Sequence, residues 1–278
     1  MTPKPQPVER LEKRLARVAR ERGLDQERLR RWVSFLALCG VLERAVEERI
    51  LGSYFLKGGV ALELRFAEEA RATKDLDLGL EGPRGSRADL FRRALELGFD
   101  AFTFRLKPQQ SRVLEQADTV RVSVAIAYRT RAWQTIEIDL GPAGAHTVDF
   151  VEPRVEGLAE LGLLVPSPVR CLGLAEQVAQ KLHACTSPRS AGRSRDVLDI
   201  LLVEMLEGLD YVRVSEAAAR VFAARGTHPF PSEFAMPAEW RPEVEALAAQ
   251  LGLPDRRAAL IEERFGAILR RIAKAVLR

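Results

Sequence analysis

The sequence predicts an α+β protein with a mixed or antiparallel sheet, a helical N-terminal extension and a mostly helical C-terminal lobe. Apolar residues recur at helical spacing through the first 50 residues, change to a period of two from Asp75 onward, and return to helical spacing in the second half. We therefore expect a helical N-terminal segment over residues 1–50, a core over 51–165 and a helical C-terminal domain over 166–278.

The composition is that of an ordinary globular protein. Of the 278 residues, 47% are hydrophobic and 29% are charged, which excludes disordered and fibrous classes. The apolar runs are short and interrupted by charge, and the N-terminus lacks the apolar core of a signal peptide. These features predict a cytoplasmic protein without membrane spans, and the net charge of +4 gives weak support to an anionic partner.

The cysteines and histidines form no recognisable disulfide or metal pattern. Three cysteines are an odd number without CxxC spacing, so we expect buried free thiols, and three histidines are too scattered for a zinc site. These residues are Cys39, Cys171, Cys185, His146, His183 and His228.

The N-terminal half begins with helices and then enters a glycine turn. Residues 8–50 carry two apolar stripes at helical spacing, with Gly23 as the break between them. The segment SYFLKGG predicts a short strand or helix end before the turn, and VALELRFAEEA predicts a helix after it.

Strands of alternating polarity follow. DLDLGL, TVRVSVAIAY and WQTIEIDL alternate, and FDAFTFRL favours a further strand. In WQTIEIDL, Glu137 and Asp139 lie on the face opposite the isoleucines. Between the first two strands, GSRADLFRRALELG predicts a helix with Ser86 as its N-cap and Gly98 as its stop.

The proline-bearing segment LVPSPVRCLG marks the next boundary, and the chain is predicted to be helical after it. The predicted ranges are 172–185, 194–207, 212–225 and a long run over 241–278.

Asp75 and Asp77 are candidate metal ligands. On a strand, residues two apart project from the same face, and two like charges this close repel unless a cation neutralises them. Magnesium takes one or two carboxylates, and Asp139 as a third would complete a two-metal site for displacement at phosphorus. Glu137 shares the face of Asp139 and stays an alternative, and D-x-D alone also fits a polar strand edge.

The glycine pair Gly58-Gly59 lies just upstream, at the start of the predicted helix. Glycines at a helix N-terminus let backbone N–H groups approach a phosphate, and Lys57 adds positive charge. Glycine pairs are also common for purely structural reasons. The combination with D-x-D favours a site for phosphate and metal.

LKGGVALELRF, RATKDLDL and QKLHACTSPRSAGRSRDVLDILL together resemble the AbiEii/AbiGii toxin family, which includes the MenT-type toxins and belongs to the polymerase-β-like nucleotidyltransferase superfamily. In that family the GG turn, the helix and D-x-D form the nucleotide and metal site. The resemblance covers residues 56–80, 137–139 and 177–202. This sequence departs from it at Val60, where the family often has threonine.

The resemblance implies a magnesium-dependent nucleotidyltransferase, with two ions and a nucleoside triphosphate (NTP) as substrate. The implied acceptor is the 3′ end of tRNA, the effect is arrest of translation, and the protein is the toxin partner of a cognate antitoxin. A protein acceptor is also open, and neither the preferred NTP nor the oligomeric state follows from the sequence.

The later motif adds candidate residues in the C-terminal half. By resemblance, Lys181 contacts the triphosphate and has a catalytic role beside Asp75 and Asp77. Asp196 and Asp199 would organise the basic residues around that site or themselves contact the nucleotide. Arg195, with Arg189 and Arg193 of the same loop, would hold phosphates. The alternative is structural, with Asp196 at a helix start and Arg195 paired with Asp199.

Thr73 is a possible regulatory site, because MenT-type members carry a serine or threonine two residues before the first aspartate that can be phosphorylated to silence the enzyme. A phosphate there would add about two negative charges and repel substrate phosphates. The alternative is a hydroxyl that only hydrogen-bonds in the turn.

Two other functional classes fit part of the pattern. A catalytically inactive nucleotide- or RNA-binding module has no need for paired Asp75 and Asp77, and a metal-dependent RNA phosphohydrolase has no need for a triphosphate cradle at Gly58-Gly59. Both features together favour the transferase.

Overall fold

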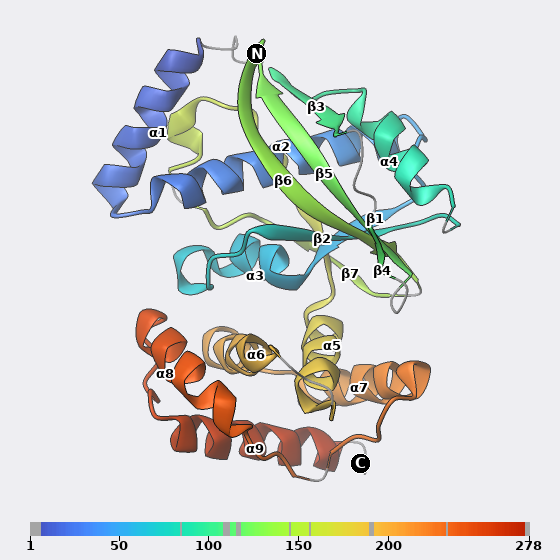
Figure 1. Ribbon diagram of the computed structural model, residues 1–278, viewed down its shortest axis with the longest axis vertical. Coiled ribbons are helices and arrows are strands. Elements are labelled where there is room, and N and C mark those ends of the chain that lie inside the picture. The colour runs from blue at the N-terminus through green and yellow to red at the C-terminus, as the bar shows by residue number, and fades with distance from the viewer. Residues whose placement is uncertain are drawn as a thin grey trace. The chain divides into compact units, whose positions relative to one another are not determined.

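Within the described residues, an eight-stranded mixed sheet organises the first part of the chain (Figure 1). The computed structural model describes residues 7–83, 85–107, 112–114, 118–144, 146–155, 157–188, 192–231 and 233–275. The chain forms two compact units, Met1–Leu172 and Gly173–Arg278.

The sheet contains both parallel and antiparallel pairs, as predicted. The strand order is β3-β5-β6-β2-β1-β8-β7, with β4 paired to β5. β2 pairs with β6 and β1 with β8 in parallel, and the other pairs are antiparallel. The strands are β1 (Tyr54–Lys57), β2 (Asp75–Leu80), β3 (Phe102–Leu106), β4 (Arg112–Leu114), β5 (Thr119–Tyr128), β6 (Arg131–Pro142), β7 (Val148–Val151) and β8 (Val169–Leu172).

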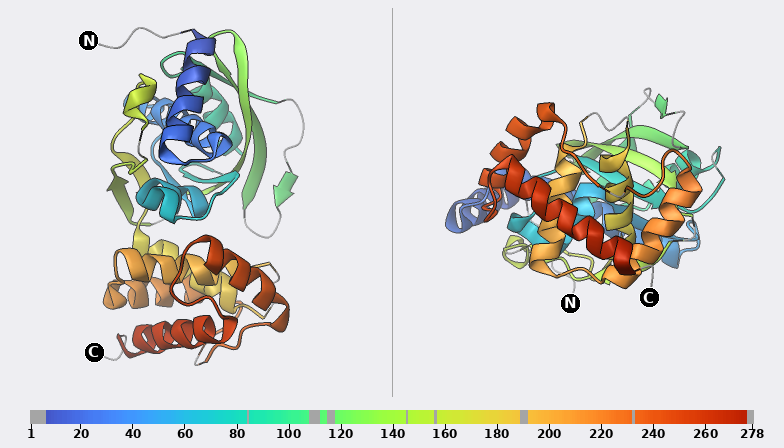
Figure 2. Two further views of the ribbon diagram at one scale, coloured as in Figure 1. Left: turned by 90° about the vertical axis from the view of Figure 1, so that its left-hand side faces the viewer. Right: turned by 90° about the horizontal axis from the view of Figure 1, so that it is seen from below.

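α2 (Gln26–Glu47) lies across one face of this sheet, and α1 (Val8–Arg22) packs against α2 (Figures 1 and 2). α1 ends at Gly23, which has the left-handed φ of 65° and confirms the predicted break. α2 begins after Asp25, whose carboxylate accepts a hydrogen bond from the Arg28 amide at 2.7 Å. Both helices share one hydrophobic core with the sheet.

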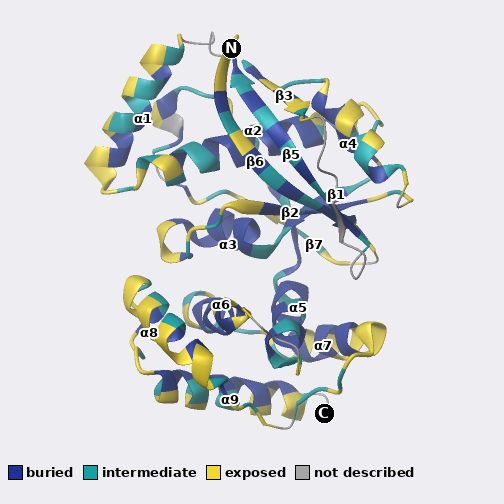
Figure 3. Cartoon of the chain, viewed as in Figure 1, coloured by how far each residue is buried: buried dark blue, intermediate teal, exposed yellow. Residues whose placement is uncertain are grey.

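The predicted alternation of the strands is confirmed. Leu76 and Leu78 of β2, Val122 and Val124 of β5 and Ile138 of β6 are all buried in the core. Figure 3 shows the change between buried and less buried residues along β5 and β6. The residues between them in sequence project from the opposite face, which carries the candidate site.

The short helices of this unit connect the strands. α3 (Gly58–Phe66) follows β1 directly and continues into the 3₁₀ turn η1 (Ala67–Glu69), and a second 3₁₀ turn, η2 (Ala159–Leu161), precedes β8. α4 (Arg87–Leu95) begins after Ser86 as predicted, but the Ser86 hydroxyl donates to the Pro83 carbonyl at 3.1 Å instead of capping the helix. The helix ends three residues before Gly98.

The unit Gly173–Arg278 is mostly helical, as predicted. The expected long run over 241–278 is wrong, because the chain breaks between α8 and α9 at Gly252, which has a φ of 64°, and Pro254. The elements are α5 (Leu174–Thr186), α6 (Ser194–Leu206), α7 (Tyr211–Arg225), η3 (Ala238–Trp240), α8 (Arg241–Gln250) and α9 (Ala258–Ala275).

Two properties expected from composition are observed. Cys39, Cys171 and Cys185 are buried free thiols. Among the helices that the structure describes, none has the length and apolar composition of a membrane span.

Candidate active site

Four carboxylates lie on the face of the sheet opposite the core, and we call them the carboxylate row. They are Asp75 and Asp77 of β2 and Glu137 and Asp139 of β6. Lys57 of β1 pairs with Asp77 of β2, and Asp77 pairs in turn with Asp139 of β6. Asp75 pairs with Glu137 in the same register. Because side chains alternate along a strand and strands lie about 4.8 Å apart, all five project from one face within reach of their neighbours. The structure thus places the predicted Asp75, Asp77 and Asp139 on one face of the sheet.

Arg121 of β5 holds the carboxylate of Asp139 from the next strand. Its Nε donates to Oδ1 at 2.7 Å and its Nη2 donates to Oδ2 at 2.6 Å. This bidentate pair raises the pKa of Arg121 above its ordinary value, and the charges of Asp75 and Glu137 add to the effect. Both oxygens of Asp139 are therefore engaged by one cation.

Glu137 remains the alternative third carboxylate, and its Oε1 accepts a hydrogen bond from the Ser123 hydroxyl at 2.6 Å. Sequence reasoning missed Arg121 and Ser123. Their signal was present in TVRVSVAIAY, where these two polar side chains alternate with valines on the strand that pairs with β6.

The donor set suits magnesium. Asp75 is exposed and Asp77 is half-buried, and carboxylate oxygens are the ligands that Mg²⁺ combines with water and phosphate oxygens. Among the described residues, no three His, Cys, Asp or Glu side chains come close enough together to hold a metal. Asp75 and Asp77 therefore fit as ligands of one ion. Asp139 would join them as a ligand only if its carboxylate gave up its ion pair with Arg121.

The glycine turn lies against the carboxylates at the N-terminus of α3. Gly58 has a φ of 66°, and a Cβ there would overlap Oδ2 of Asp77. A Cβ at Gly59 would lie 2.9 Å from both Cβ and Oγ1 of Thr73. The two glycines thus allow Asp77 and Thr73 to approach the start of the helix, where backbone N–H groups favour an anion. Val60, which follows, is buried.

Lys57 crosses the same face of the sheet. A Cβ built at Gly141 of β6 would lie 3.1 Å from its Nζ and 3.4 Å from the Thr119 hydroxyl. Since Lys57 is opposite Asp77 in the register, its ammonium reaches past β2 toward β6. It places positive charge beside the carboxylate row, as a phosphate site requires.

Glu63 of α3 anchors the segment that leads into β2, and sequence reasoning missed it. The side chain is buried, and its carboxylate accepts hydrogen bonds from Arg28 Nε at 2.8 Å, Trp32 Nε1 at 3.2 Å and the Thr73 amide at 3.1 Å. Burial raises the pKa of Glu63, while Arg28 and the hydrogen bonds oppose the shift. Arg28 also donates to the carbonyls of Ala67 and Ala70, so the turn before the aspartates is fixed at several points.

The later motif forms a buried ion cluster within the unit Gly173–Arg278. Lys181 Nζ of α5 lies 2.8 Å from Asp196 Oδ1 and 2.6 Å from Asp199 Oδ2 of α6. All three side chains are at most 10% exposed. Both aspartates thus contact the ammonium of Lys181, and the contacts of Lys181, Asp196 and Asp199 with a nucleotide stay predictions.

The basic loop beside this cluster has partners of its own. Arg195 Nε donates to Glu243 Oε1 at 3.1 Å, and Arg193 lies 3.6 Å from Asp196. Arg189 lies outside the described residues. The predicted phosphate contact of Arg195 stays a prediction.

The fold is similar to that of a solved nucleotidyltransferase. The structure is similar to MenT4, a nucleotidyltransferase toxin from Mycobacterium tuberculosis, with 16% identity and a TM-score of 0.58. The similarity covers 96% of this chain and 98% of that chain, so the fold is shared over nearly the full length.

Two other solved structures are similar over a smaller share of the chain. ANT(2'')-Ia in complex with adenylyl-2''-tobramycin is 17% identical over 67% of this chain and 95% of that chain, with a TM-score of 0.40. An antigenic nucleotidyltransferase-like protein from Paracoccidioides brasiliensis is 16% identical over 80% of this chain and 95% of that chain, with a TM-score of 0.42.

The family is shown by the sequence. The family model described as nucleotidyl transferase AbiEii toxin, type IV TA system, matches residues 40–271. The chain belongs to this family of nucleotidyltransferase toxins, which confirms the resemblance inferred from the glycine turn, D-x-D and the later motif. No curated protein matches the sequence.

Proposed function

We propose that this toxin is a magnesium-dependent enzyme that transfers a nucleotide from an NTP to the 3′ end of tRNA in the cytoplasm, and so blocks translation. The observation that supports the proposal is the row of Lys57, Asp77 and Asp139 beside the N-terminus of α3. It puts metal-binding carboxylates next to a helix terminus and a lysine that favour phosphate.

The reaction balances with an RNA hydroxyl as the nucleophile. The 3′ oxygen forms a bond to the α-phosphorus, the bond from that phosphorus to the bridging oxygen of the β-phosphate breaks, and pyrophosphate leaves. The hydroxyl proton passes to a carboxylate or to water. When bound, magnesium supplies charge neutralisation for the attacking and leaving oxygens. Asp75 and Asp77 would hold the metal, and Lys57 with the first amides of α3 would orient the triphosphate.

The proposal is tested by incubating the full chain with total tRNA, magnesium and each α-labelled NTP separately, followed by a denaturing gel. We expect label on tRNA with the wild type and none with Asp75→Asn Asp77→Asn, a pair that keeps the shape and removes the charge. RNA shortened without NTP would instead identify a phosphohydrolase. Binding of NTP without transfer to RNA or protein would identify a binding module. Label found on protein would show that the acceptor is a protein and not tRNA.

The third carboxylate is tested by a matched pair of amide variants. Because Asp139 aligns with Asp77 across β2 and β6, Asp139→Asn should lower transfer by about a hundredfold, whereas Glu137→Gln should keep most of it. The measurement is the initial rate of label transfer over a magnesium titration. A larger loss of transfer in Glu137→Gln than in Asp139→Asn would show that Glu137 is the third carboxylate.

The cognate antitoxin would act by modifying Thr73 or by sequestering the toxin. Thr73 lies against Gly59 at the start of α3, and its hydroxyl donates to the Asp75 carbonyl at 3.4 Å. A phosphate on Thr73 would therefore compete for the positive end of the helix and repel the substrate phosphates. Intact-mass measurement of toxin expressed with and without its antitoxin separates the two modes.

A further inference from the structure

The face of the sheet that carries the carboxylate row continues across β5 to the edge strand β3. The Lys107 amide, just after β3, donates to the Ser123 carbonyl of β5 at 2.9 Å. Ser123 pairs with Glu137 of β6, which pairs in turn with Asp75 of β2. Because strands lie about 4.8 Å apart, the backbone of Lys107 is roughly 10 Å from that of Glu137 and roughly 14 Å from that of Asp75. The surface therefore leads from the sheet edge to the candidate metal site.

This part of the sheet face is open. In Figure 1, α2 passes behind β5 and β6, and no described helix lies in front of them. Thr103, Arg105 and Lys107 are exposed, and Ala125 and Ala127 of β5 are half-buried. Since alanine carries only a methyl group, these two positions form a low surface between β3 and β6. A flexible chain fits on this surface without displacing a side chain.

Arg105 and Lys107 supply the positive charge of this surface. Arg105 pairs with Ala125, and Ala125 lies two residues from Ser123, so both basic side chains project from the face of the carboxylate row. Within the part of the chain that the structure describes, neither side chain takes part in an ion pair. Exposed cations of this kind suit the phosphates of a nucleic acid.

The chemistry of nucleotidyl transfer decides which substrate approaches from β5. The triphosphate is proposed to lie at the start of α3, which follows β1 on the other side of β2 from β6. In displacement at phosphorus, the attacking and leaving oxygens are roughly in line, on opposite sides of the phosphorus. With pyrophosphate leaving toward α3, the attacking hydroxyl comes from the side of β6 and β5.

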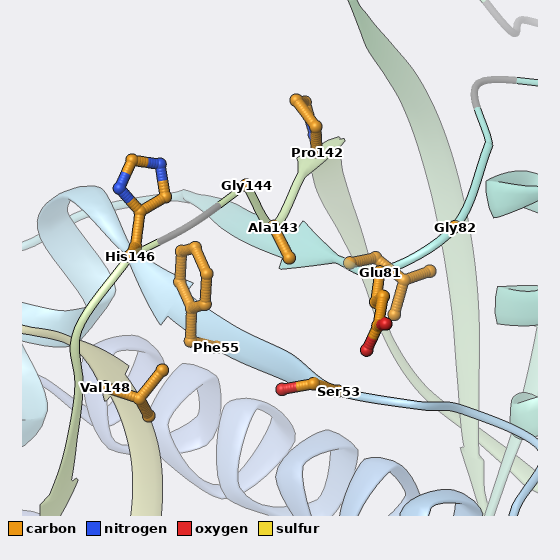
Figure 4. Close-up of a pocket in the computed structure, with 10 residues that line it drawn as sticks. Ser53, Phe55, Glu81, Gly82, Pro142, Ala143, Gly144, His146 and Val148 are labelled. Carbon is orange, nitrogen blue, oxygen red and sulfur yellow. The ribbon is translucent and has the colours of Figure 1, made fainter.

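A second open region beside the site does not suit an RNA backbone. A pocket of about 420 Å³ lies beyond the end of β2 and is lined in part by Ser53, Phe55 and Glu81 (Figure 4). The carboxylate of Glu81 repels phosphates, and Phe55 is only 2% exposed. Among the described residues that line this pocket, none is a lysine or an arginine. The charges therefore favour the surface of β5 and β3.

We propose that the open face of β5 and β3 binds the single-stranded 3′ end of the RNA acceptor, with phosphates on Arg105 and Lys107 and the terminal hydroxyl at the carboxylate row. The proposal rests on the proposed nucleotidyl transfer and assigns its acceptor surface. At about 3.4 Å per nucleotide of a stacked strand, the separation from Lys107 to the carboxylates holds about three or four nucleotides. Phosphate contacts carry no sequence information, so binding here requires a free 3′ tail of any sequence.

The test measures RNA binding without NTP, so that no transfer takes place. The full chain is titrated into a fluorescein-labelled RNA stem with a short single-stranded 3′ tail, and into the same stem with a blunt end. Fluorescence anisotropy over a series of salt concentrations gives the affinity and its salt dependence. Arg105→Gln Lys107→Gln is compared with Arg10→Gln Lys13→Gln, which removes the same two charges from exposed positions on α1, a helix that packs against α2.

Loss of Arg105 and Lys107 should weaken binding of the tailed RNA about tenfold at physiological salt. The slope of log affinity against log salt should become shallower by about 1.4, because each phosphate contact with a single strand contributes about 0.7. The control pair on α1 should keep the wild-type slope and the preference for tailed over blunt RNA.

A second variant blocks the same surface without removing a basic residue. Ala125→Glu places a carboxylate directly opposite Arg105, where a cross-strand ion pair helps the variant to fold. The new carboxylate neutralises Arg105 and repels phosphates, so this variant should bind tailed RNA more weakly than wild type does, by about tenfold.

The outcomes separate this surface from the transferase reaction. Binding of tailed RNA that depends on Arg105 and Lys107 supports the surface even if no transfer is ever detected. Transfer to tRNA with an unchanged KM for RNA in Arg105→Gln Lys107→Gln would overturn the surface and leave the proposed function standing. Absence of RNA binding by folded wild type, equal binding of tailed and blunt RNA, or equal weakening by the two charge-removing pairs would also overturn it.

Discussion

At the scale of single residues, the backbone of Gly58 and the carboxylate of Asp77 are coupled. Gly58 takes a left-handed φ of 66° at the start of α3, and Asp77 fills the space where a Cβ would be. An alanine here would meet two separate penalties, one from the backbone conformation and one from the overlap. Gly23 has nearly the same φ, 65°, but no atom lies within 4 Å of a Cβ built there. An alanine at Gly23 would therefore meet only the penalty from the backbone conformation.

Gly23→Ala should lower the free energy of unfolding by about 1–2 kcal/mol, because it forces alanine into the left-handed region, and Gly58→Ala should lower it further, because its Cβ also overlaps Asp77. Only Gly58→Ala displaces Asp77, so it alone should reduce nucleotide transfer, by about a hundredfold. Urea unfolding and initial transfer rates on both variants check this. Equal transfer by the two variants would show that the approach of Asp77 to the glycine has no catalytic consequence.

Residues whose role depends on their own strand were predictable, and residues whose role depends on register were not. Asp75 and Asp77 share a face because they are two apart on β2, which is a local property. The bond from Arg121 to Asp139 depends on how β5 pairs with β6, and the bond from Glu63 to the Thr73 amide depends on where a turn folds back. No spacing within the sequence specifies either contact.

At the scale of elements, α5 and α6 are joined by the buried cluster of Lys181, Asp196 and Asp199. One ammonium there faces two carboxylates, and removal of the ammonium would leave two like charges close together away from water. Buried ion pairs are costly when one partner is lost, and often nearly neutral when all partners are replaced by uncharged groups.

Lys181→Met should therefore lower the free energy of unfolding by about 3–5 kcal/mol, because both buried aspartates lose their contact with the ammonium. The triple variant Lys181→Met Asp196→Asn Asp199→Asn should recover much of that loss. Chemical denaturation of the single and triple variants provides the measurement. If Lys181→Met kept wild-type stability and lost only transfer, the lysine would act on substrate and the cluster would have no structural role.

Elements with a strong local period were predicted, and elements made by long-range pairing were missed. β2, β5 and β6 follow from alternation, and α5, α6 and α7 follow from helical spacing. β7 and β8 have four residues each, and β8 is placed beside β1 in parallel across more than 100 residues of chain. The segment LVPSPVRCLG, interpreted as a boundary, therefore contributes a strand to the sheet.

At the scale of the whole molecule, stability in acid depends in part on a histidine that the fold keeps neutral. His183 of α5 is 5% exposed, with Arg225 Nη1 3.1 Å from its Nδ1 and the Thr227 hydroxyl 3.0 Å from its Nε2. Burial, followed by the charges of Arg225 and His228, lowers the pKa of His183 from 6.5 to about 4. Since Arg225 can only donate, Nδ1 accepts and the proton of the neutral ring is on Nε2.

The direction of the pH effect follows from which state binds the proton. Between pH 6.5 and about 4 the unfolded chain protonates His183 while the folded chain does not, so stability is complete above pH 6.5 and falls as the pH drops toward 4. We expect this residue to account for a loss of about 2 kcal/mol over that range. His183→Gln removes the titration, so its stability deficit relative to wild type should shrink as the pH falls. Urea unfolding of both proteins at pH 7, 6, 5 and 4 measures this, and a deficit that stays constant would mean that His183 is protonated in the folded molecule as readily as in the unfolded chain.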